Sequence, residues 1–453
     1  MNVPTITAEH LVHVNVRGLQ PHPQNARKHP IKQLKRLAKN IEQFGFIIPI
    51  VIEESGQIIC GHARVEAAKR LKMTEIPAIR MTNLTEPQIR AFMLADNRLA
   101  ELAQWDESLL AENLKFLSDY NLNFEWEMIG FDYGEIEYRI VQFENTGEQA
   151  DKADEMPQAS GIDPVCRKGD AWHLGDHRLL CADATVLAAY ETLLENQQAA
   201  MIFSDPPYNL AAREIGQVCK SRHGDFAMAA GEMTSEEFTA FLDTVMTLLC
   251  RFSVPGSIHF LFMDWRHVSE ILTAGLKRYD AFKNLCVWIK DRPGMASFYR
   301  SQHELIFVFK NGNAAHQNNF ELGQFGRTRS NVWHYPSVRS MSIEDGDPDR
   351  DDALNLHPTV KPVKLIEDAI LDCSRRGEVV LYPFLGSGST LIACEKIHRL
   401  CYGIELEPRY ADVAIQRWQQ WTGQEAIHRE TGMTYSQLSA QRRNTICEEN
   451  NHE

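Results

Sequence analysis

The chain has 453 residues, of which 44% are hydrophobic and 24% are charged, so two or three globular domains are expected. It holds no run of about 18 apolar residues, and its first residues lack the layout of a signal peptide, so we expect no membrane association. The ten cysteines are scattered without a C-x-x-C pair, which disfavours a zinc site and a disulfide framework. We therefore predict a cytoplasmic protein that binds no metal.

The net charge of −14 is unevenly distributed along the chain. Residues 1–100 carry 14 Lys and Arg against 8 Asp and Glu, whereas residues 101–165 carry 3 against 16. Binding to nucleic acid depends on the local potential rather than on the total charge. The acidic total therefore does not exclude DNA as a partner.

The first hundred residues show helical and extended patterns in alternation. Apolar residues at helical spacing between 34 and 44 are followed by Gly45, a typical helix stop. Gly61 opens a second helix, and a capping box beginning at Thr85 starts a third, which we expect to end near Arg98. Extended segments are predicted at residues 46–53, 57–60 and 76–81. The pattern predicts a small α+β unit.

Composition changes suggest four parts of the chain. After the unit at 1–100, residues 101–164 form an acidic helical connector that ends in a polar linker. Strands and helices alternate over 165–430, which predicts an α/β domain with a mostly parallel sheet. Residues 431–453 are a polar tail.

Three short apolar runs of the α/β region, 199–203, 379–381 and 401–404, are each followed by polar residues. This pattern is typical of strands buried on both faces, with functional loops at their carboxyl ends. These loops are therefore the candidate catalytic and ligand-binding segments.

The first of these loops is Asp205-Pro206-Pro207-Tyr208. Two prolines stiffen the backbone, so that the Asp205 carboxylate and a carbonyl offer two acceptors for the two hydrogens of an aromatic amino group. Tyr208 supplies a flat face on which an extruded base stacks. Taken alone, the tetrapeptide is equally compatible with a simple turn and an N-cap aspartate.

The second loop runs from residue 383 to 390 and contains Phe384, Gly386 and Gly388 before a helix. Glycines allow a close approach of the backbone to a ligand at a helix N-terminus. Glu405 ends the next strand, where nucleotide-binding sheets hold a ribose hydroxyl with an acidic residue. The alternative is an ordinary βαβ unit.

A third motif precedes a helix that begins near residue 363. It contains Thr359 and Lys361, which suit a carboxylate as a hydrogen-bond donor and a cation. Alone, it is compatible with a proline-bounded helix start.

Together the motifs resemble the amino-methyltransferases of DNA, which methylate adenine or cytosine amino groups, over residues 165–430. The catalytic tetrapeptide precedes the glycine loop, as in the permuted subgroup of that family. The resemblance implies a Rossmann-like fold, S-adenosylmethionine as cofactor, double-stranded DNA as substrate, and catalysis by Asp205, Pro206, Pro207 and Tyr208. The cofactor-binding residues that it implies are Asp183, Thr359, Lys361, Phe384, Gly386, Gly388 and Glu405.

One position departs from the family pattern. The family usually has an acidic residue before the Pro-Phe of the glycine loop, near the amino end of the cofactor's methionine part, and this chain has Tyr382. This departure keeps open an alternative of another class, a nucleotide-responsive DNA-binding module with a degenerate methylase domain. Within the family, Asp205 in place of serine favours adenine N6 over cytosine N4 as the target.

The first hundred residues resemble the ParB-like family, whose fold is shared by chromosome-partition proteins and sulfiredoxins. The resemblance is carried by three segments, 25–27, 61–64 and 96–98. It implies an anion or CTP-type nucleotide site formed by Gly61, His62, Arg64, Asn97 and Arg98. The alternative is a scaffold that only docks DNA or a partner. Cys60 precedes the glycine rather than a His-Arg pair, which disfavours sulfiredoxin chemistry.

Target recognition is assigned to two segments. Residues 211–231 follow the catalytic loop, and we expect them to close over DNA. Residues 288–339 interleave basic and aromatic side chains, which suits phosphate contact and base stacking. The residues concerned are Lys290, Arg292, Arg300, Lys310, Arg327, Arg329, Arg339, Trp288, Phe298, Tyr299, Trp333 and Tyr335.

Overall fold

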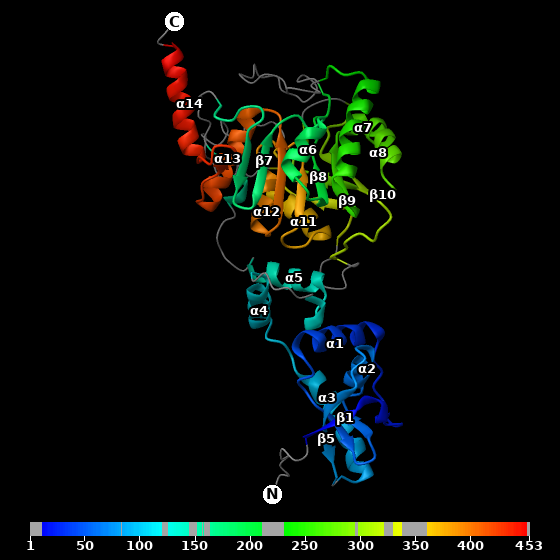
Figure 1. Cartoon of the computed structure of the whole chain (residues 1–453). Helices are drawn as coiled ribbons and strands as arrows, with labels where there is room; N and C mark the ends of the chain where they lie inside the picture. Colours follow the sequence, from blue (N-terminus) through cyan, green and yellow to red (C-terminus); the bar gives the residue numbers. More distant parts are fainter. Residues whose placement is uncertain are drawn as a thin grey trace. The chain divides into compact units, whose positions relative to one another are not determined.

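The chain divides into two compact units, Met1–Glu148 and Gln149–Glu453 (Figure 1). In this computed structural model no described helix is long and apolar enough to cross a membrane. The described residues are 11–82, 84–119, 126–144, 152–155, 157, 164–210, 231–294, 298–320, 329–337 and 360–450. The four-part division suggested by composition stays a prediction.

The N-terminal unit is built on a five-stranded mixed sheet with the order β1-β5-β3-β4-β2. Its core holds apolar side chains from the strands, such as Ile50 and Ile76, together with Val65 from the first turn of the helix His62–Arg70. The strands are β1 (Leu11–Asn15), β2 (Gln20–Pro21), β3 (Ile50–Glu53), β4 (Gln57–Cys60) and β5 (Glu75–Met81).

Three helices accompany this sheet, α1 (Ile31–Phe44), α2 (His62–Arg70) and α3 (Glu86–Leu102). Their boundaries confirm the predicted signals: Gly45 and Gly61 flank α1 and α2 with positive φ, and Thr85 forms a capping box at the start of α3. Helix α3 continues four residues past the predicted end at Arg98, because no glycine or proline interrupts it.

The helical part of the acidic connector packs with the N-terminal unit. It comprises α4 (Glu107–Asp119), a 3₁₀ turn η3 (Trp126–Ile129) and α5 (Tyr133–Glu144), which share a small apolar core. Arg36 of α1 forms an ion pair with Asp132 and donates to the Gly130 carbonyl at 2.9 Å. Lys32 is 2.9 Å from the same aspartate. Basic residues of α1 thus neutralise part of the connector's acidity.

The C-terminal unit is built on a ten-stranded sheet with the order β12-β10-β11-β9-β8-β13-β14-β7-β6-β15. The central run from β9 to β7 is parallel, and antiparallel pairs lie toward both edges. The strands are β6 (Ala171–Leu174), β7 (His177–Cys181), β8 (Ala199–Ser204), β9 (Ser253–Met263), β10 (Ala281–Ile289), β11 (His303–Lys310), β12 (Val332–His334), β13 (Val379–Tyr382), β14 (Leu400–Glu405) and β15 (Ile427–His428).

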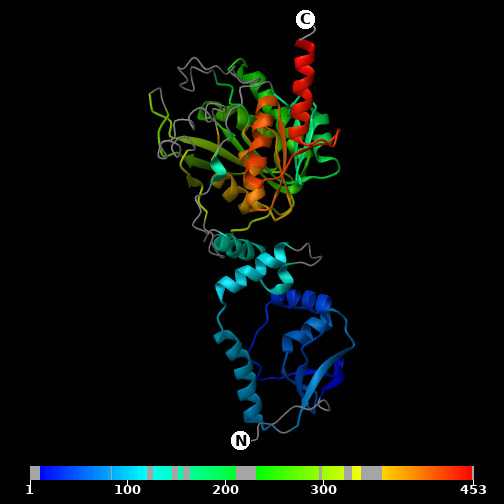
Figure 2. The same cartoon turned by 90° about the vertical axis from the view of Figure 1, so that its left-hand side faces the viewer.

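Helices cover both faces of this sheet (Figures 1 and 2). Alternate side chains of a strand point to opposite faces: Ile202 of β8 joins the core under α6 (Leu187–Leu194), α7 (Ser235–Arg251) and α8 (Val268–Arg278). Its neighbour Met201 instead meets Cys373 at 3.8 Å on the opposite face. That face carries α11 (Val363–Cys373), α12 (Ser389–Lys396) and α13 (Pro408–Thr422). The polar tail forms α14 (Tyr435–Asn450).

The order of the strands places the loops of interest side by side. The three predicted buried strands are confirmed as β8, β13 and β14, which are adjacent and parallel. From β8 the chain proceeds to β9 on one side, and from β13 to β14 on the other. The gap between β8 and β13 is therefore a topological switch point, at whose carboxyl edge open α/β sheets bind ligands.

Candidate active site

Asp205 follows the last residue of β8 and lies in a buried cluster of charges. Its Oδ2 is 2.5 Å from Nζ of Lys361, whose side chain is only 3% exposed. The same ammonium is 3.1 Å from Oε2 of Glu304 at the start of β11. The Tyr208 hydroxyl lies 2.5 Å from Asp205 Oδ1 and 3.1 Å from Glu304 Oε2. Two carboxylates thus share one lysine and one phenol.

The buried position of these groups shapes their protonation. Burial raises the pKa of Asp205, Lys361 partly offsets this effect, and the charge of Glu304 adds to it. Burial acts in the same direction on Glu304, but the charges of Lys361 and Lys290 prevail and lower its pKa to about 2. The two carboxylates raise the pKa of Lys361, so its ammonium stays charged. The positive charge of Lys361 therefore favours the ionised form of Asp205, although this carboxylate is largely shielded from water.

The glycine loop turns tightly between β13 and α12. Gly386 and Gly388 have φ of 56° and 81°, in the left-handed region. A Cβ on Gly388 would come within 3.0 Å of Ala414, so the position tolerates only glycine without movement. The buried Arg417 braces the loop, since its guanidinium donates to the Ser387 carbonyl at 3.2 Å and to the Ser389 hydroxyl at 3.0 Å.

Glu405 joins the glycine loop to the end of β14. Its Oε2 accepts the Gly386 N–H at 2.6 Å, and its Oε1 accepts the Glu407 N–H at 2.9 Å. Burial raises the pKa of Glu405 to about 7. Within the described part of the chain no cationic side chain forms an ion pair with it. A buried carboxylate with acceptor capacity to spare, held beside a glycine turn, fits the hydroxyls of a nucleoside.

The remaining predicted cofactor residues lie near this loop or outside the described residues. Asp183 follows β7 on the same edge of the sheet, where its carboxylate accepts the Thr185 N–H at 2.8 Å. The half-buried Phe384 ring lies 6.2 Å from the Phe241 ring. Thr359 falls outside the described residues.

Tyr382, at the position where the family usually has an acid, is buried at the end of β13. Its ring lies 6.1 Å from that of Phe203, and its hydroxyl faces Thr390. Burial raises the pKa of Tyr382 well above its usual range, and the charges of Asp205 and Glu405 raise it further. The position therefore contributes a neutral phenol that senses the charges of two carboxylates.

Two residues of the charge cluster, Glu304 and Lys290, were not assigned to the catalytic site from the sequence. Lys290 follows β10 and its Nζ is 2.6 Å from Glu304 Oε1. The available signal was an acidic residue at the start of an otherwise apolar segment, residues 304–309. Placing it in the site required knowing that β11 runs antiparallel to β9, so that β11 begins at the edge where β8 ends.

The structure separates the basic and aromatic residues predicted to bind DNA into two groups. Trp288 and Trp333 are buried, and Arg329 pairs with Asp372 at 3.1 Å, so these are structural. Phe298 and Tyr299 are 92% and 80% exposed, with Arg292 and Arg300 on the same loop. Arg327 and Arg339 lie outside the described residues, as does the segment predicted to close over DNA, apart from Gly231.

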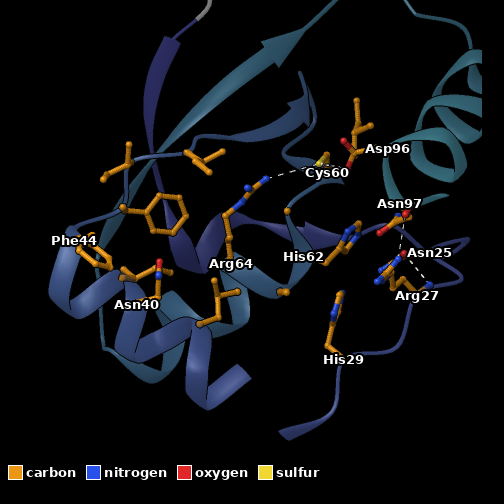
Figure 3. Close-up of a pocket in the computed structure, with 18 of the residues that line it drawn as sticks. Asn25, Arg27, His29, Asn40, Phe44, Cys60, His62, Arg64, Asp96 and Asn97 are labelled. Carbon is orange, nitrogen blue, oxygen red and sulfur yellow. Dashed lines mark hydrogen bonds between the residues drawn. The ribbon is translucent and has the colours of Figure 1, made fainter. Parts of the chain in front are cut away.

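The N-terminal unit contains a cavity of about 420 Å³ where α1, β4, α2 and α3 meet. Figure 3 shows Arg64 pointing toward Cys60, with His62, Arg27 and Asn97 grouped on the right. Gly61, at the start of α2, cannot carry a Cβ, which would come within 2.7 Å of Ile50. The cavity brings together Gly61, His62, Arg64 and Asn97, four of the five predicted residues.

The surroundings of this cavity determine the protonation state of two of its side chains, His62 and Cys60. Burial, with the charges of His29 and His22, lowers the pKa of His62 to about 4, so its imidazole is neutral and accepts the His22 N–H at 3.2 Å. Burial and Asp96 raise the pKa of Cys60 to about 11, which disfavours thiolate chemistry. Nε of Arg64 is buried and has no hydrogen-bond partner among the residues that the structure describes. Arg98, the fifth predicted residue, is exposed and pairs with Glu101 at 3.1 Å outside the cavity.

Comparisons with known proteins agree with this architecture. The DNA methylase family model matches residues 199–416, and the ParB N-terminal domain model matches residues 2–98. The chain is 26% identical over 258 residues to the type II methyltransferase M.HpaI of Haemophilus parainfluenzae, covering 53% of this chain and 74% of that protein.

Two further relatives match the two units separately. The type II methyltransferase M2.DpnII of Streptococcus pneumoniae is 27% identical over 236 residues, covering 48% of this chain and 81% of that protein. The ParB-like nuclease domain-containing protein YnaK of Escherichia coli is 42% identical over 78 residues, covering 17% of this chain and 90% of that protein. Residues 199–416 therefore form a DNA methylase domain of the N6/N4 type, and the N-terminal unit contains a ParB-like domain.

Proposed function

We propose that the chain transfers a methyl group from S-adenosylmethionine to the N6 amino group of adenine at specific sites in double-stranded DNA. The observation that carries this proposal is the buried Asp205 carboxylate, which lies at the switch point next to the strand that leads into the glycine loop. A carboxylate is a stronger hydrogen-bond acceptor than the serine hydroxyl that is the alternative at this position, and Asp205 in place of serine favours adenine. Methylation of cytosine N4 is the second candidate within the family. Digesting modified DNA to nucleosides and identifying the product by mass spectrometry tests the choice, and methylcytosine as sole product would refute it.

The residues around the glycine loop fit the cofactor. Gly386 and Gly388 would let the backbone approach it, and Glu405 would accept hydrogen bonds from its ribose hydroxyls. We assign Asp183 and Phe384 to the adenine end, by their place on the same edge of the sheet. Thr359 is kept in the cofactor site as a proposal. When bound, S-adenosylmethionine supplies an electrophilic methyl group on a positively charged sulfur.

The catalytic loop would orient the amino group of an extruded base. Each carboxylate oxygen offers more than one acceptor site, so Asp205 can accept an amino hydrogen while it remains paired with Lys361. The carbonyl of Pro206 accepts the second hydrogen, the ring of Pro207 keeps the backbone stiff, and Tyr208 stacks on the base. The amino group loses a proton as the N–C bond forms. We propose that Asp205 is the first group to accept this proton. Catalysis rests on positioning and on preorganised charge.

The raised pKa of Glu405 predicts a pH dependence of cofactor binding. The ionised carboxylate predominates above pH 7 and becomes protonated below it, so acceptor strength is present at high pH and lost as the pH falls. Calorimetry is expected to show S-adenosylmethionine binding about 10-fold weaker at pH 6 than at pH 8. In Glu405→Gln the affinity should be low at both pH values. An unchanged pH dependence in that variant would assign the titration to another group.

We propose a second function for the N-terminal unit, the binding of a CTP-type nucleotide in the cavity. Arg64 and Arg27 offer cationic groups for phosphates, Asn97 and neutral His62 offer polar groups, and the cavity volume of about 420 Å³ is in the range of ligand sites. Titration calorimetry with CTP and with ATP is expected to show binding of CTP that is lost in Arg64→Ala. The exposed Arg98→Ala is the matched control, and equal losses in both variants would contradict the assignment.

A further inference from the structure

The connection between β10 and β11 carries two aromatic side chains that the fold leaves in solvent. Phe298 is 92% exposed and Tyr299 is 80% exposed. Their rings meet edge to face, with centroids 4.6 Å apart. Burying such side chains is favourable, whereas here most of the surface of both side chains is exposed. Two adjacent exposed aromatic rings therefore form a feature that a partner is expected to cover.

Hydrogen bonds join the two sides of this connection and restrain the backbone next to the aromatic rings. The antiparallel ladder continues past the strands, with the Lys290 N–H donating to the Gln302 carbonyl at 2.9 Å and the Gly294 N–H donating to the Ser301 carbonyl at 2.8 Å. The Arg300 guanidinium donates to the carbonyls of Gly294 and Pro293 at 3.0 and 3.2 Å. The residue directly after the aromatic pair is thus fixed to the opposite side of the connection.

The same connection begins and ends at the catalytic charge cluster. Lys290, at its start, and Glu304, two residues after Gln302, form an ion pair of 2.6 Å. Glu304 in turn contacts Tyr208 and Lys361. The aromatic pair therefore extends from the strands that flank the proposed base-holding residues.

We propose that Phe298 and Tyr299 enter the DNA duplex beside the target base and stack in the gap that the extruded base leaves. This inference rests on the proposed function, because methylation of an amino group in a duplex requires the base to leave the stack. Apolar side chains that wedge between base pairs offset part of the cost of unstacking.

The surroundings of the pair favour DNA over a protein as the partner. Arg292, which lies 3.9 Å from Asp291, is 55% exposed at its side chain, and Arg300 is also exposed, so two cations lie on the same connection as the rings. Cations beside stacking rings suit phosphates next to bases. An apolar protein partner would instead require the rings to lie within a larger uncharged patch.

The test combines binding and methyl transfer with the full chain and the double variant Phe298→Ala/Tyr299→Ala. The binding probe is a fluorescein-labelled duplex with one abasic site, compared with the same duplex intact. The exchanged variant Phe298→Tyr/Tyr299→Phe keeps both rings, and Trp421→Ala removes an exposed aromatic ring on α13. Methyl transfer is measured on plasmid DNA, both as duplex and after heat denaturation to single strands.

We expect the parent chain to bind the abasic duplex about 10-fold more tightly than the intact one, and the alanine variant to lose this preference. Its methyl transfer should fall about 10-fold or more on duplex DNA and remain near the parent rate on single strands, where no gap forms. The exchanged variant and Trp421→Ala should match the parent in every assay.

Several outcomes would overturn the proposal. They are an alanine variant that keeps the preference for the abasic duplex, a parent that has none, or equal losses on duplex and single strands. If the parent shows the preference and the alanine variant loses it, but no DNA is methylated, the stacking role stands and the proposed methyl transfer fails. The two hypotheses are thus separated by the same set of measurements.

Discussion

Asp205→Asn is expected to lower the rate of methyl transfer to DNA by about 10³-fold, because loss of a preorganised charge at a reacting group costs about 10²–10³ or more in rate. Asparagine keeps the shape of the side chain but loses the negative charge that faces Lys361. Its amide also presents hydrogens where the amino group of the base needs acceptors. The substitution therefore removes the polarisation of the target nitrogen and leaves the backbone of the loop intact.

The measurement for Asp205→Asn separates catalysis from binding. Within the described part of the chain, Asp205 forms no hydrogen bond or ion pair with the glycine loop or Glu405, so calorimetry should give an affinity for S-adenosylmethionine within about 2-fold of the parent. Asp280→Asn is a suitable control, because Asp280 precedes β10 at the opposite edge of the sheet, where it accepts the Gly312 N–H. An Asp205→Asn variant that keeps more than about a tenth of the parent rate would show that Asp205 has no role in the chemical step.

Lys361→Met is expected to have the second largest effect, on both activity and stability. The ammonium is the cation shared by Asp205 and Glu304, and all three groups are buried. Removing one partner of a buried ion pair costs about 3–5 kcal/mol, because the remaining charge is left uncompensated. Urea denaturation should show a loss of this size. Lys364→Met, at an exposed position in the first turn of α11, should cost about 1 kcal/mol or less.

The same variant should change the pH dependence of methyl transfer. Lys361 lowers the pKa of both carboxylates, so without it the pKa of Asp205 rises further above its usual range. The ionised form of Asp205, which accepts the amino hydrogens, is then less populated than in the parent and is regained as the pH increases. A pH–rate profile of Lys361→Met that rises toward high pH is the expected result. A profile parallel to that of the parent would mean that Lys361 does not control Asp205.

The ion pairs of Glu304 stabilise the fold at neutral pH, and this contribution is lost only in acid. Its pKa of about 2 in the folded protein lies below the ordinary value of 4.5, so its ion pairs stabilise the fold fully above pH 4.5. That contribution is lost as the pH falls from 4.5 toward 2. Glu304 is therefore ionised in the folded protein at neutral pH.

Local sequence patterns predicted the part of the site that follows parallel strands. A short apolar run followed by a polar residue places that residue at the carboxyl edge of the sheet, and this holds for Asp205 after β8 and for Glu405 at the end of β14. The glycine loop was predictable for the same reason. Each of these inferences needs only the residues on either side of one strand end.

Contacts between distant segments were not predictable in the same way. Lys361 was identified as a residue that suits a carboxylate, but its partner Asp205 lies 156 residues earlier in the chain. Glu304 required the direction of an antiparallel strand. Arg98 follows Asn97 on α3, and one helical residue turns a side chain by about 100°, so only Asn97 lines the cavity.

Long-read modification mapping of DNA from cells that express the parent chain or Asp205→Asn tests the central claim most directly. We expect N6-methyladenine at one recurring sequence in DNA from cells with the parent chain, and none at that sequence with Asp205→Asn. Unmodified DNA from cells that contain the folded parent chain would contradict the claim, as would the same modification in both samples.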